Sequence, residues 1–411
     1  MIHSSGSVMD RRTLLKTGSL AVLGLGFGGC ASRPVQPATP TARRPMIRLA
    51  PIRASWDRVI RTTVGLRPHR PSGFTVRAQK LDGKLLVHDY GHGGAGLSLT
   101  WGTGAMAADL ALGREERRAA VIGSGVAGLT AARQLQRRGF DVTIYAMAVP
   151  PDTTSNMSYG GFTPTSGLVS RDGATPAWEA EFRQAVDIAY KELQLLAGRD
   201  YGVSWLDSYA TREELPTVED AEDDEDALLP PHIRPIRTGG EILHPGEHPF
   251  DAPYAIRRPA MRIEPSIYLD ALMRDVRAFG GRTVIRKFDT VRDLMTLGEP
   301  VIVNCAGLGS RDLFGDQELI PVKGQLTFLV PQPEVDYQFG CNPRSDGIAL
   351  GSTREPNVWS LEPDPEARQR IVDRAIERFA TMRAPDPTLQ LTRSRAPAAM
   401  PGVESFFGME S

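Results

Sequence analysis

The sequence has 411 residues, with 48 lysine and arginine against 49 aspartate and glutamate, so its formal net charge is −1. A chain of this length exceeds the usual size of one domain, and a net charge so close to zero argues against a nucleic-acid partner. Glycine is the outlier, because 41 residues are about a tenth of the chain and exceed the usual share of ~7%. Three cysteines, Cys30, Cys305 and Cys341, make no disulfide framework and have no spacing typical of a zinc site.

The first thirty residues have the pattern of an export signal. Arg11 and Arg12 precede a weakly apolar stretch over residues 14–27, and several glycines lie within it and directly behind it. Each glycine weakens a helix by about 1 kcal/mol, so a buried helix is the less favoured interpretation. The paired arginines predict export by the twin-arginine route to the periplasm or the cell surface, with Met9 as an alternative start.

Residues 27–30, Phe-Gly-Gly-Cys, resemble a bacterial lipoprotein cleavage box, although Phe27 stands where a small aliphatic residue is usual. A lipidated Cys30 would tether the chain to a membrane face without spanning the membrane. The Pro/Ala/Thr-rich segment over residues 31–45 would then be the linker. An exported protein without a lipid anchor is the alternative.

The pattern Gly-x-Gly-x-x-Gly occurs at residues 24–29, 91–96 and 123–128. Only the third copy follows an apolar strand pattern and opens a helix pattern, and a second strand pattern follows at residues 141–145. Gly123 would permit the tight turn, Gly125 the approach of the backbone to a pyrophosphate, and Gly128 close packing of helix on strand. The sequence therefore predicts a dinucleotide-binding βαβ unit. A βαβ unit without a dinucleotide is the alternative.

The second strand of this unit lacks one expected feature. An acidic residue usually ends it and holds the ribose hydroxyls, but Met147 stands there. Asp152 or a backbone group would have to replace the missing carboxylate.

Four segments resemble the D-amino-acid oxidase family of flavoenzymes, namely residues 151–164, 301–307, 321–325 and 350–353. Two further blocks of that family follow its catalytic domain, whereas in this chain their counterparts, GLRPHRP at residues 65–71 and HDYGHGGAGLS at residues 88–98, precede the glycine motif. The chain thus looks like a circular permutant of the family. If so, residues 393–399 should lie beside residues 56–63.

The resemblance implies an α/β fold, with a Rossmann-like FAD-binding domain on a parallel sheet and a substrate domain on a mixed or antiparallel sheet. Residues 83–170 and 262–318 would form the FAD-binding domain. The substrate domain would comprise residues 46–82, 171–261 and 319–398. An acidic run at residues 219–226 is expected to be a solvated loop.

The resemblance also implies FAD as the cofactor and no metal. It assigns to the flavin the glycine turn, the segment after the second strand, the block at residues 93–98 and the Asn-Cys-Ala-Gly segment, in which Cys305 would be a buried structural thiol. The residues so assigned are Gly93, Gly94, Gly96, Leu97, Ser98, Gly123, Gly125, Val126, Ala127, Gly128, Thr153, Thr154, Ser155, Gly160, Gly161, Ala306 and Gly307.

The activity implied is oxidation of D-amino acids by hydride transfer from Cα to the flavin, with dioxygen as acceptor and a 2-oxo acid, ammonia and hydrogen peroxide as products. Arg67 would clamp the substrate carboxylate, because a planar guanidinium makes two charge-assisted hydrogen bonds to it. The carbonyl of Gly94 would receive the amino group. Phe339 stands where the family has a pocket tyrosine and would be the third catalytic residue, with Tyr337 nearby as a substitute. Arg70 has the pattern of a salt-bridge residue.

Other functions stay open. One is an oxidase for glycine or sarcosine, and another is an oxidase for acidic substrates of the D-aspartate type. The latter needs a second pocket arginine, for which Arg257, Arg258 and Arg354 are candidates. A third alternative is an exported flavoprotein without turnover. Assembly into a homo-oligomer also stays open.

Overall fold

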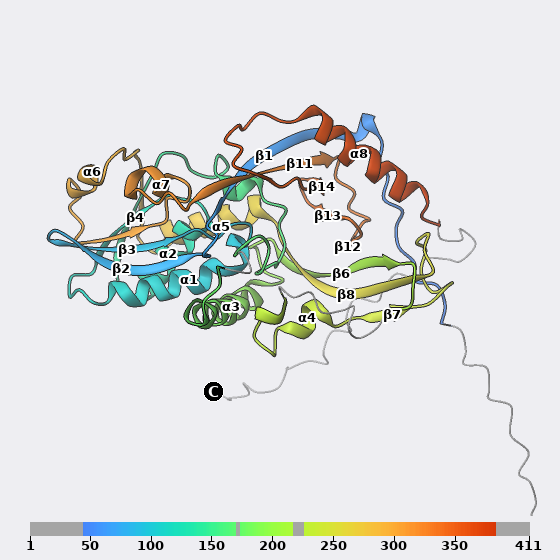
Figure 1. Ribbon diagram of the computed structural model, residues 1–411, viewed down its shortest axis with the longest axis horizontal. Coiled ribbons are helices and arrows are strands. Elements are labelled where there is room, and N and C mark those ends of the chain that lie inside the picture. The colour runs from blue at the N-terminus through green and yellow to red at the C-terminus, as the bar shows by residue number, and fades with distance from the viewer. Residues whose placement is uncertain (1–43, 170–172, 217–225, 384–411) are drawn as a thin grey trace, which may run out of the picture. The chain divides into compact units, whose positions relative to one another are not determined.

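The computed structural model describes residues 44–169, 173–216 and 226–383, and a compact unit begins at Pro45. The strands of this unit form three sheets, and Figure 1 shows that each sheet combines strands from distant parts of the chain. The export signal with Cys30, residues 31–43 of the linker, residues 393–399 and all of the acidic run except Asp226 lie outside the described residues. No described helix is long and apolar enough to cross a membrane.

The first sheet is the parallel sheet that the sequence predicted. Its strand order is β2 (Thr75–Leu81), β3 (Lys84–Tyr90), β10 (Val301–Asn304), β4 (Arg118–Ile122), β5 (Asp141–Ala146) and β9 (Arg282–Ile285). All neighbours from β3 to β9 pair in parallel, and β2 joins β3 as an antiparallel hairpin. The central strands are continuous apolar runs because both faces of the sheet are covered.

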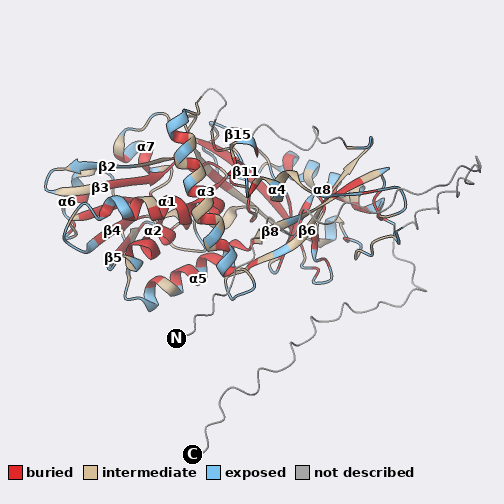
Figure 2. Ribbon diagram, turned by 90° about the horizontal axis from the view of Figure 1, so that it is seen from below, coloured by how far each residue is buried: buried red, intermediate tan, exposed pale blue. Residues whose placement is uncertain are grey.

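Helices cover both faces of this sheet (Figure 1). One core unites α1 (Gly96–Ala111), α2 (Val126–Arg137), α3 (Pro176–Leu196) and α5 (Pro265–Ala278) with the sheet. A smaller core contains the other strand residues together with Leu294 from α6 (Val291–Met295) and Leu313 from α7 (Gly309–Phe314). Figure 2 shows the buried side of these elements in red.

The second sheet has the order β1 (Val59–His69), β11 (Ile320–Leu329), β14 (Gly347–Gly351) and β13 (Cys341–Arg344), and β15 (Glu355–Pro356) also pairs with β11. All its pairs are antiparallel, and α8 (Pro365–Ala380) packs on β11 and β14. β1 and β11 pair in register from Arg61 opposite Phe328 to His69 opposite Ile320. This long pairing fixes the position of Arg67 opposite Val322.

The third sheet has the order β12 (Tyr337–Gln338), β6 (Val203–Arg212), β8 (Tyr254–Ile263) and β7 (Glu241–Leu243). It is mixed, because β12 runs parallel to β6 while the other pairs are antiparallel. Beside it lies α4 (Arg234–Thr238). Short 3-10 turns complete the described elements: η1 (Trp56–Arg58), η2 (Thr154–Met157) and η4 (Asp226–Leu228).

Two of the predicted domain boundaries need correction. β2 pairs with β3 along its whole length, so a boundary between residues 82 and 83 would divide a hairpin. The helix α3, which the prediction placed in the substrate domain, buries Phe182 and Ala185 in the same core as α1 and α2. Both elements therefore belong with the parallel sheet, because their hydrogen bonds and apolar faces are satisfied there.

The beginning of this unit lies against its last described helix. The indole Nε1 of Trp56 donates a hydrogen bond to Oδ1 of Asp373 at 3.0 Å, and the guanidinium of Arg368 lies 5.7 Å from the Trp56 ring centroid. Figure 1 shows β1 and α8 beside each other. The two ends of the described fold are thus neighbours, although the particular contact predicted for residues 393–399 lies outside the described residues.

Candidate active site

The predicted glycine turn connects β4 to α2. Gly123 has a φ of +106°, and a Cβ on it would lie 2.5 Å from the carbonyl oxygen of Cys305. A Cβ on Gly128 would lie 1.9 Å from the carbonyl oxygen of Gly123, so the helix begins in direct contact with the turn. Gly125 caps α2, which starts at Val126. Glycine is therefore required at positions 123 and 128, and the predicted strand-turn-helix is confirmed.

The segment after β5 lies against this turn. The backbone amide of Val126 donates a hydrogen bond to Oγ of Ser155 at 3.0 Å, and Oγ of Ser124 donates to the carbonyl of Ala148 at 2.6 Å. A Cβ on Gly65 would approach Met157 to 2.9 Å, so η2 also contacts β1. The structure thus brings the predicted residues Thr153, Thr154 and Ser155 to the start of α2.

The strand β10 ends beside the same turn. The amide of Cys305 donates a hydrogen bond to the carbonyl of Ile122 at 2.9 Å, which places Ala306 and Gly307 next to the end of β4. Carboxyl ends of parallel strands are where open α/β sheets bind ligands. The Cys305 side chain is buried, and burial raises the pKa of its thiol well above the ordinary value. The prediction of a structural thiol is confirmed.

The block at residues 93–98 forms the third side of the site. A Cβ on Gly96, the first residue of α1, would lie 3.4 Å from Cγ1 of Val126, the first residue of α2. The amino ends of two helices therefore meet at the predicted flavin residues. Each amino end carries partial positive charge and amides without intrahelical acceptors, which suits an anionic group. The buried Leu97 anchors the first turn of α1 in the core.

Ser98 connects α1 to the segment that contains Gly160 and Gly161. Its Oγ donates a hydrogen bond to the carbonyl of Gly161 at 3.3 Å and accepts one from the amide of Thr163 at 2.8 Å. The amide Nδ2 of Asn342 holds the same segment by donating to the carbonyl of Gly160 at 2.7 Å. Asn342 belongs to no motif, so no sequence signal indicates this contact.

The site residues form a cradle that fits a dinucleotide. The glycine turn has no room for side chains, and two helix amino ends supply donors for a pyrophosphate. At the end of β5, Met147 has 72% of its surface exposed, and Asp152 is an exposed residue whose amide donates to the carbonyl of Val149. The site therefore lacks the usual carboxylate at the strand end, as the sequence predicted.

Arg67 lies in β1 beside Gly94. Its Nη1 donates to the carbonyl of Thr353 at 3.2 Å and its Nη2 to Oγ of Ser352 at 3.0 Å. A Cβ on Gly94 would lie 3.5 Å from Cδ of Arg67, so the two predicted catalytic residues are neighbours. Among the residues that the structure describes, no carboxylate pairs with Arg67. Its half-buried guanidinium is therefore a cation with neutral partners only.

Gly324 lies in the neighbouring strand β11, opposite Gly65, and leaves the space that the Arg67 guanidinium occupies. A Cβ there would lie 2.4 Å from Nη1 of Arg67. Burial lowers the pKa of the Arg67 guanidinium, and the charge of Arg354 lowers it further. Arg354 lies against Gly167, where a Cβ would be 3.0 Å from its Nη1. A second cation thus stands close to Arg67.

The three candidates for a second pocket arginine have different surroundings. Arg257 pairs with Asp207 at 2.7 Å and with Glu241 at 3.6 Å, so its charge is compensated. Arg258 lines a cavity over one face of the paired strands β6 and β8. Arg354 lies near Arg67, whose pKa its charge lowers. The structure therefore leaves Arg258 and Arg354 as candidates and removes Arg257.

Phe339 is a packing residue, which corrects its predicted place among the catalytic residues. Its ring centroid lies 4.2 Å from that of Phe250 and 6.3 Å from that of Phe379, within an aromatic core. The nearby Tyr337 cannot replace a pocket tyrosine, because it is fully buried and its hydroxyl donates to the carbonyl of Ala50 at 2.8 Å. Both aromatic side chains fill the core between the second and third sheets.

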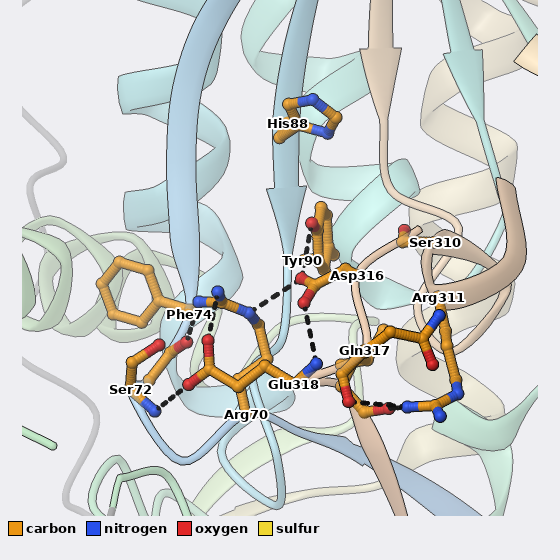
Figure 3. A network of polar contacts seen from close by, with 12 residues as sticks. Arg70, Ser72, Phe74, His88, Tyr90, Ser310, Arg311, Asp316, Gln317 and Glu318 are labelled. Carbon is orange, nitrogen blue, oxygen red and sulfur yellow. Dashed lines mark hydrogen bonds and ion pairs between the residues drawn. The ribbon is translucent and has the colours of Figure 1, made fainter. Parts of the chain in front are cut away.

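Arg70 holds a polar network at the edge of the first sheet (Figure 3). Its Nε lies 2.9 Å from Asp316, its Nη2 lies 2.6 Å from Glu318, and the Tyr90 hydroxyl donates to Asp316 at 2.8 Å. The interpretation of Arg70 as a salt-bridge residue is confirmed. Its acidic partners belong to no motif and could not be identified from the sequence.

The fold and this site together define a dinucleotide-binding α/β protein with an arginine beside the dinucleotide cradle that has no carboxylate partner among the described residues. A family model described as FAD dependent oxidoreductase matches residues 118–403. The chain belongs to this family, and it is a flavoenzyme whose cofactor is FAD. The match begins at the first residue of β4.

Individual relatives are more distant. A D-amino-acid oxidase from Rubrobacter xylanophilus is 28% identical over 325 residues, which cover 72% of this chain and 90% of that protein. A human D-aspartate oxidase is 28% identical over 265 residues, covering 62% of this chain and 74% of that protein. The crystal structure of a glycine oxidase from Geobacillus kaustophilus aligns over 66% of this chain and 81% of that chain, with 18% identity and a TM-score of 0.46. This structural match is too distant to bear on function.

Proposed function

We propose that this chain oxidises D-amino acids and that Arg67 holds the substrate carboxylate. The observation that carries the proposal is the half-buried Arg67 guanidinium, which lies beside Gly94 and has no carboxylate partner among the described residues. A buried cation without a counter-ion is costly, and a bound carboxylate would offset that cost. The relative from Rubrobacter xylanophilus, a D-amino-acid oxidase, points to the same substrate class.

The cofactor would be held by the glycine turn at residues 123–128, by Ser155 and by residues 93–98. When bound, FAD accepts hydride from an amino acid and passes the electrons to dioxygen. The amino ends of α1 and α2 would stabilise the negative charge of the pyrophosphate and of the reduced ring, because both helices begin at the cradle. Gly160, Gly161, Ala306 and Gly307 would close the remaining sides.

The substrate would be oriented by two groups of the chain. Arg67 would donate two parallel hydrogen bonds to the α-carboxylate, and so fix its plane. The carbonyl of Gly94 would accept a hydrogen bond from the amino group, which leaves the Cα–H directed at the cofactor. An amine that binds neutral needs no general base. The imine product then reacts with water to give a 2-oxo acid and ammonia, and dioxygen is reduced to hydrogen peroxide.

A direct test is anaerobic reduction of the purified yellow protein. We expect D-alanine to bleach the visible flavin absorption and L-alanine to leave it unchanged. Bleaching by glycine or sarcosine alone would indicate a different amine oxidase. A flavin that neither these amines nor D-aspartate and D-glutamate reduce would contradict the proposal and indicate a flavoprotein without turnover.

We also propose that the chain order is a circular permutation of the family order. In support, the blocks at residues 65–71 and 88–98 precede β4, the family model begins at residue 118, and Trp56 contacts α8 near the other end. In a rearranged variant, the carboxyl end is linked to residue 46 and the new termini lie between residues 113 and 118. This variant should fold and bind flavin, which makes it yellow. A matched variant with its new termini inside β10 should neither fold nor bind flavin. A colourless, unfolded product of the first design would contradict the permutation.

We propose further that residues 1–30 direct export by the twin-arginine route, with Cys30 as the candidate lipid anchor. Arg11, Arg12 and the apolar stretch behind them support export, and residues 27–30 support the anchor. Replacement of both arginines by lysine should keep the protein in the cytoplasm, as measured by cell fractionation. Export of that variant at the normal level would contradict the proposal.

A further inference from the structure

We propose that a cavity lined by three arginines binds an anionic group on the substrate side chain, so that the enzyme prefers amino acids with an acidic side chain. The inference rests on the proposed oxidation of D-amino acids and names the substrate class within it. The arginines are Arg212 in β6, Arg237 in α4 and Arg258 in β8. We call them the arginine cluster.

The cavity has a volume of about 420 Å³ and lies between the third sheet, α4 and the segment that contains Gly161 and Thr163. The three guanidinium groups are close enough to interact. Burial lowers the pKa of Arg258, the charges of Arg212 and Arg237 lower it further, and only Asp226 acts in the opposite direction. Three positively charged guanidinium groups therefore lie close together around this cavity.

Asp226 is the one carboxylate that lines the cavity in the described part of the chain. Its Oδ1 lies 3.5 Å from Nε of Arg237, so it compensates one of the three cations. Arg212 donates to the carbonyl of Thr211 at 2.9 Å, and Nε of Arg258 is buried without a hydrogen-bond partner among the described residues. One carboxylate thus faces three arginines in the described part of the cavity, which leaves an excess of two positive charges. A bound anion would satisfy them.

One chain segment joins the arginine cluster to the site around Arg67. Gly161 and Thr163 line the cavity and bind Ser98 in the first turns of α1. Further along the same segment, Ser166 lies next to Gly94, because a Cβ added to Gly94 would be 2.8 Å from the carbonyl oxygen of Ser166. A substrate that places its α-carboxylate at Arg67 would therefore extend its side chain along this segment toward the cluster.

The neighbour of Arg258 provides an internal control. Side chains alternate between the two faces of a strand, so Arg257 and Arg258 point to opposite faces of β8. Arg257 meets Asp207 and Glu241, whereas Arg258 meets other arginines and one aspartate. Two adjacent arginines thus differ in whether their charge is already compensated.

The test compares pairs of D-amino acids that differ only in side-chain charge. For the FAD-loaded full chain we expect kcat/KM to be roughly 10- to 100-fold higher for D-glutamate than for D-glutamine, because one or two charge-assisted hydrogen bonds are worth about that much. D-aspartate and D-asparagine form a second pair of different length. The acid-to-amide ratio is the kcat/KM for the acidic substrate divided by that for its amide. Arg258→Gln and Arg212→Gln should each bring this ratio close to one, mainly by raising KM for the acidic substrate. Arg257→Gln should keep the ratio of the unmodified protein.

A binding measurement distinguishes a failure of the anion site from a failure of the proposed oxidation. We expect glutarate to bind the holoprotein more tightly than butyrate by calorimetry, and Arg258→Gln to abolish the difference. If D-alanine is oxidised while the acid-to-amide ratio is near one, the arginine cluster has no role in selection and the proposed oxidation stands. If no D-amino acid is oxidised, the proposed function fails. Equal binding of glutarate and butyrate would then overturn the anion site as well.

Discussion

Arg67 and Arg70 come from one short motif, yet their surroundings differ completely. Arg70 has a side chain that is only 13% exposed, and it pairs with Asp316 and Glu318 in the network of Figure 3. Within the part of the chain that the structure describes, Arg67 donates only to Ser352 and to the backbone of Thr353. The same residue type therefore stabilises the fold in one place and is available to a ligand in the other. The difference lies in the counter-charge, which the motif does not contain.

The largest expected effect tests the Arg67 side of this comparison. Arg67→Ala should lower kcat/KM for the D-amino-acid substrate by at least about 100-fold, because two charge-assisted hydrogen bonds are lost. The protein should stay yellow and folded. Arg67→Lys should recover only part of the activity, since lysine supplies charge without the planar geometry. Steady-state kinetics with near-normal values for Arg67→Ala would remove Arg67 from the site.

Arg70→Ala should have the opposite profile. Removing one partner of a mostly buried ion pair leaves Asp316 uncompensated, so we expect a loss of about 3 kcal/mol in the free energy of unfolding. The kcat/KM of the protein that remains folded should change by less than about threefold. Arg114→Ala, which breaks the exposed pair with Glu116, should cost less than about 1 kcal/mol in urea unfolding. A large loss of activity without a loss of stability would contradict the structural role of Arg70.

His88 extends the comparison to pH, because it lies near the Arg70 network (Figure 3). Burial, with a smaller contribution from Arg77, lowers the pKa of His88 from 6.5 to about 4. The folded state therefore binds a proton at His88 more weakly than the unfolded chain does. The stabilisation of the fold by neutral His88 is complete above pH 6.5 and is lost as the pH falls toward 4. Between pH 7 and pH 5 we expect the free energy of unfolding to fall by about 2 kcal/mol from this group.

Urea unfolding at the two pH values measures this effect. His88→Gln should remove that part of the pH dependence, whereas His244→Gln, at an exposed position, should keep it. Identical pH dependence in the unmodified protein and in His88→Gln would show that His88 is not the responsible group.

The smallest expected effect refines the position of Arg67. Gly324→Ala would place a Cβ 2.4 Å from Nη1 of Arg67, so the guanidinium must move. Because the displaced atoms are the end of a flexible side chain, we expect a loss of about 10-fold in kcat/KM with little change in stability. Gly298→Ala, where no atom lies within 4 Å of the new Cβ, is the matched control. Unchanged kinetics of Gly324→Ala would mean that the exact position of the guanidinium is unimportant.

The parallel sheet and the cofactor turn could be predicted because their signals are local. Gly123 and Gly128 are needed within a few residues of each other, and the apolar strand before them is continuous. The assignment of Arg67 and Gly94 to one site depends on the family resemblance. The structure brings the two residues together, although they belong to a strand and a turn separated by the β2–β3 hairpin.

Features that depend on distant partners could not be predicted. The motif position of Phe339 suggests a pocket residue, but its ring packs on Phe250 and Phe379, which come from other parts of the chain. Arg257 and Arg258 are adjacent in the sequence, and only the pairing of β8 with β6 and β7 shows which of them meets carboxylates. The space at Gly324 is defined by the opposite strand, which no local pattern reveals.

The pairing of β1 with β11 has a consequence for biosynthesis. Arg67 is opposite Val322, so a strand made near the beginning of the chain pairs with one made about 255 residues later. At the usual rate of synthesis, roughly 13 to 50 s pass between the translation of β1 and that of β11. During this time the backbone edge of β1 and the Leu66 side chain lack the partners that β11 supplies. Protection by a chaperone should therefore matter most while residues 70–320 are being translated.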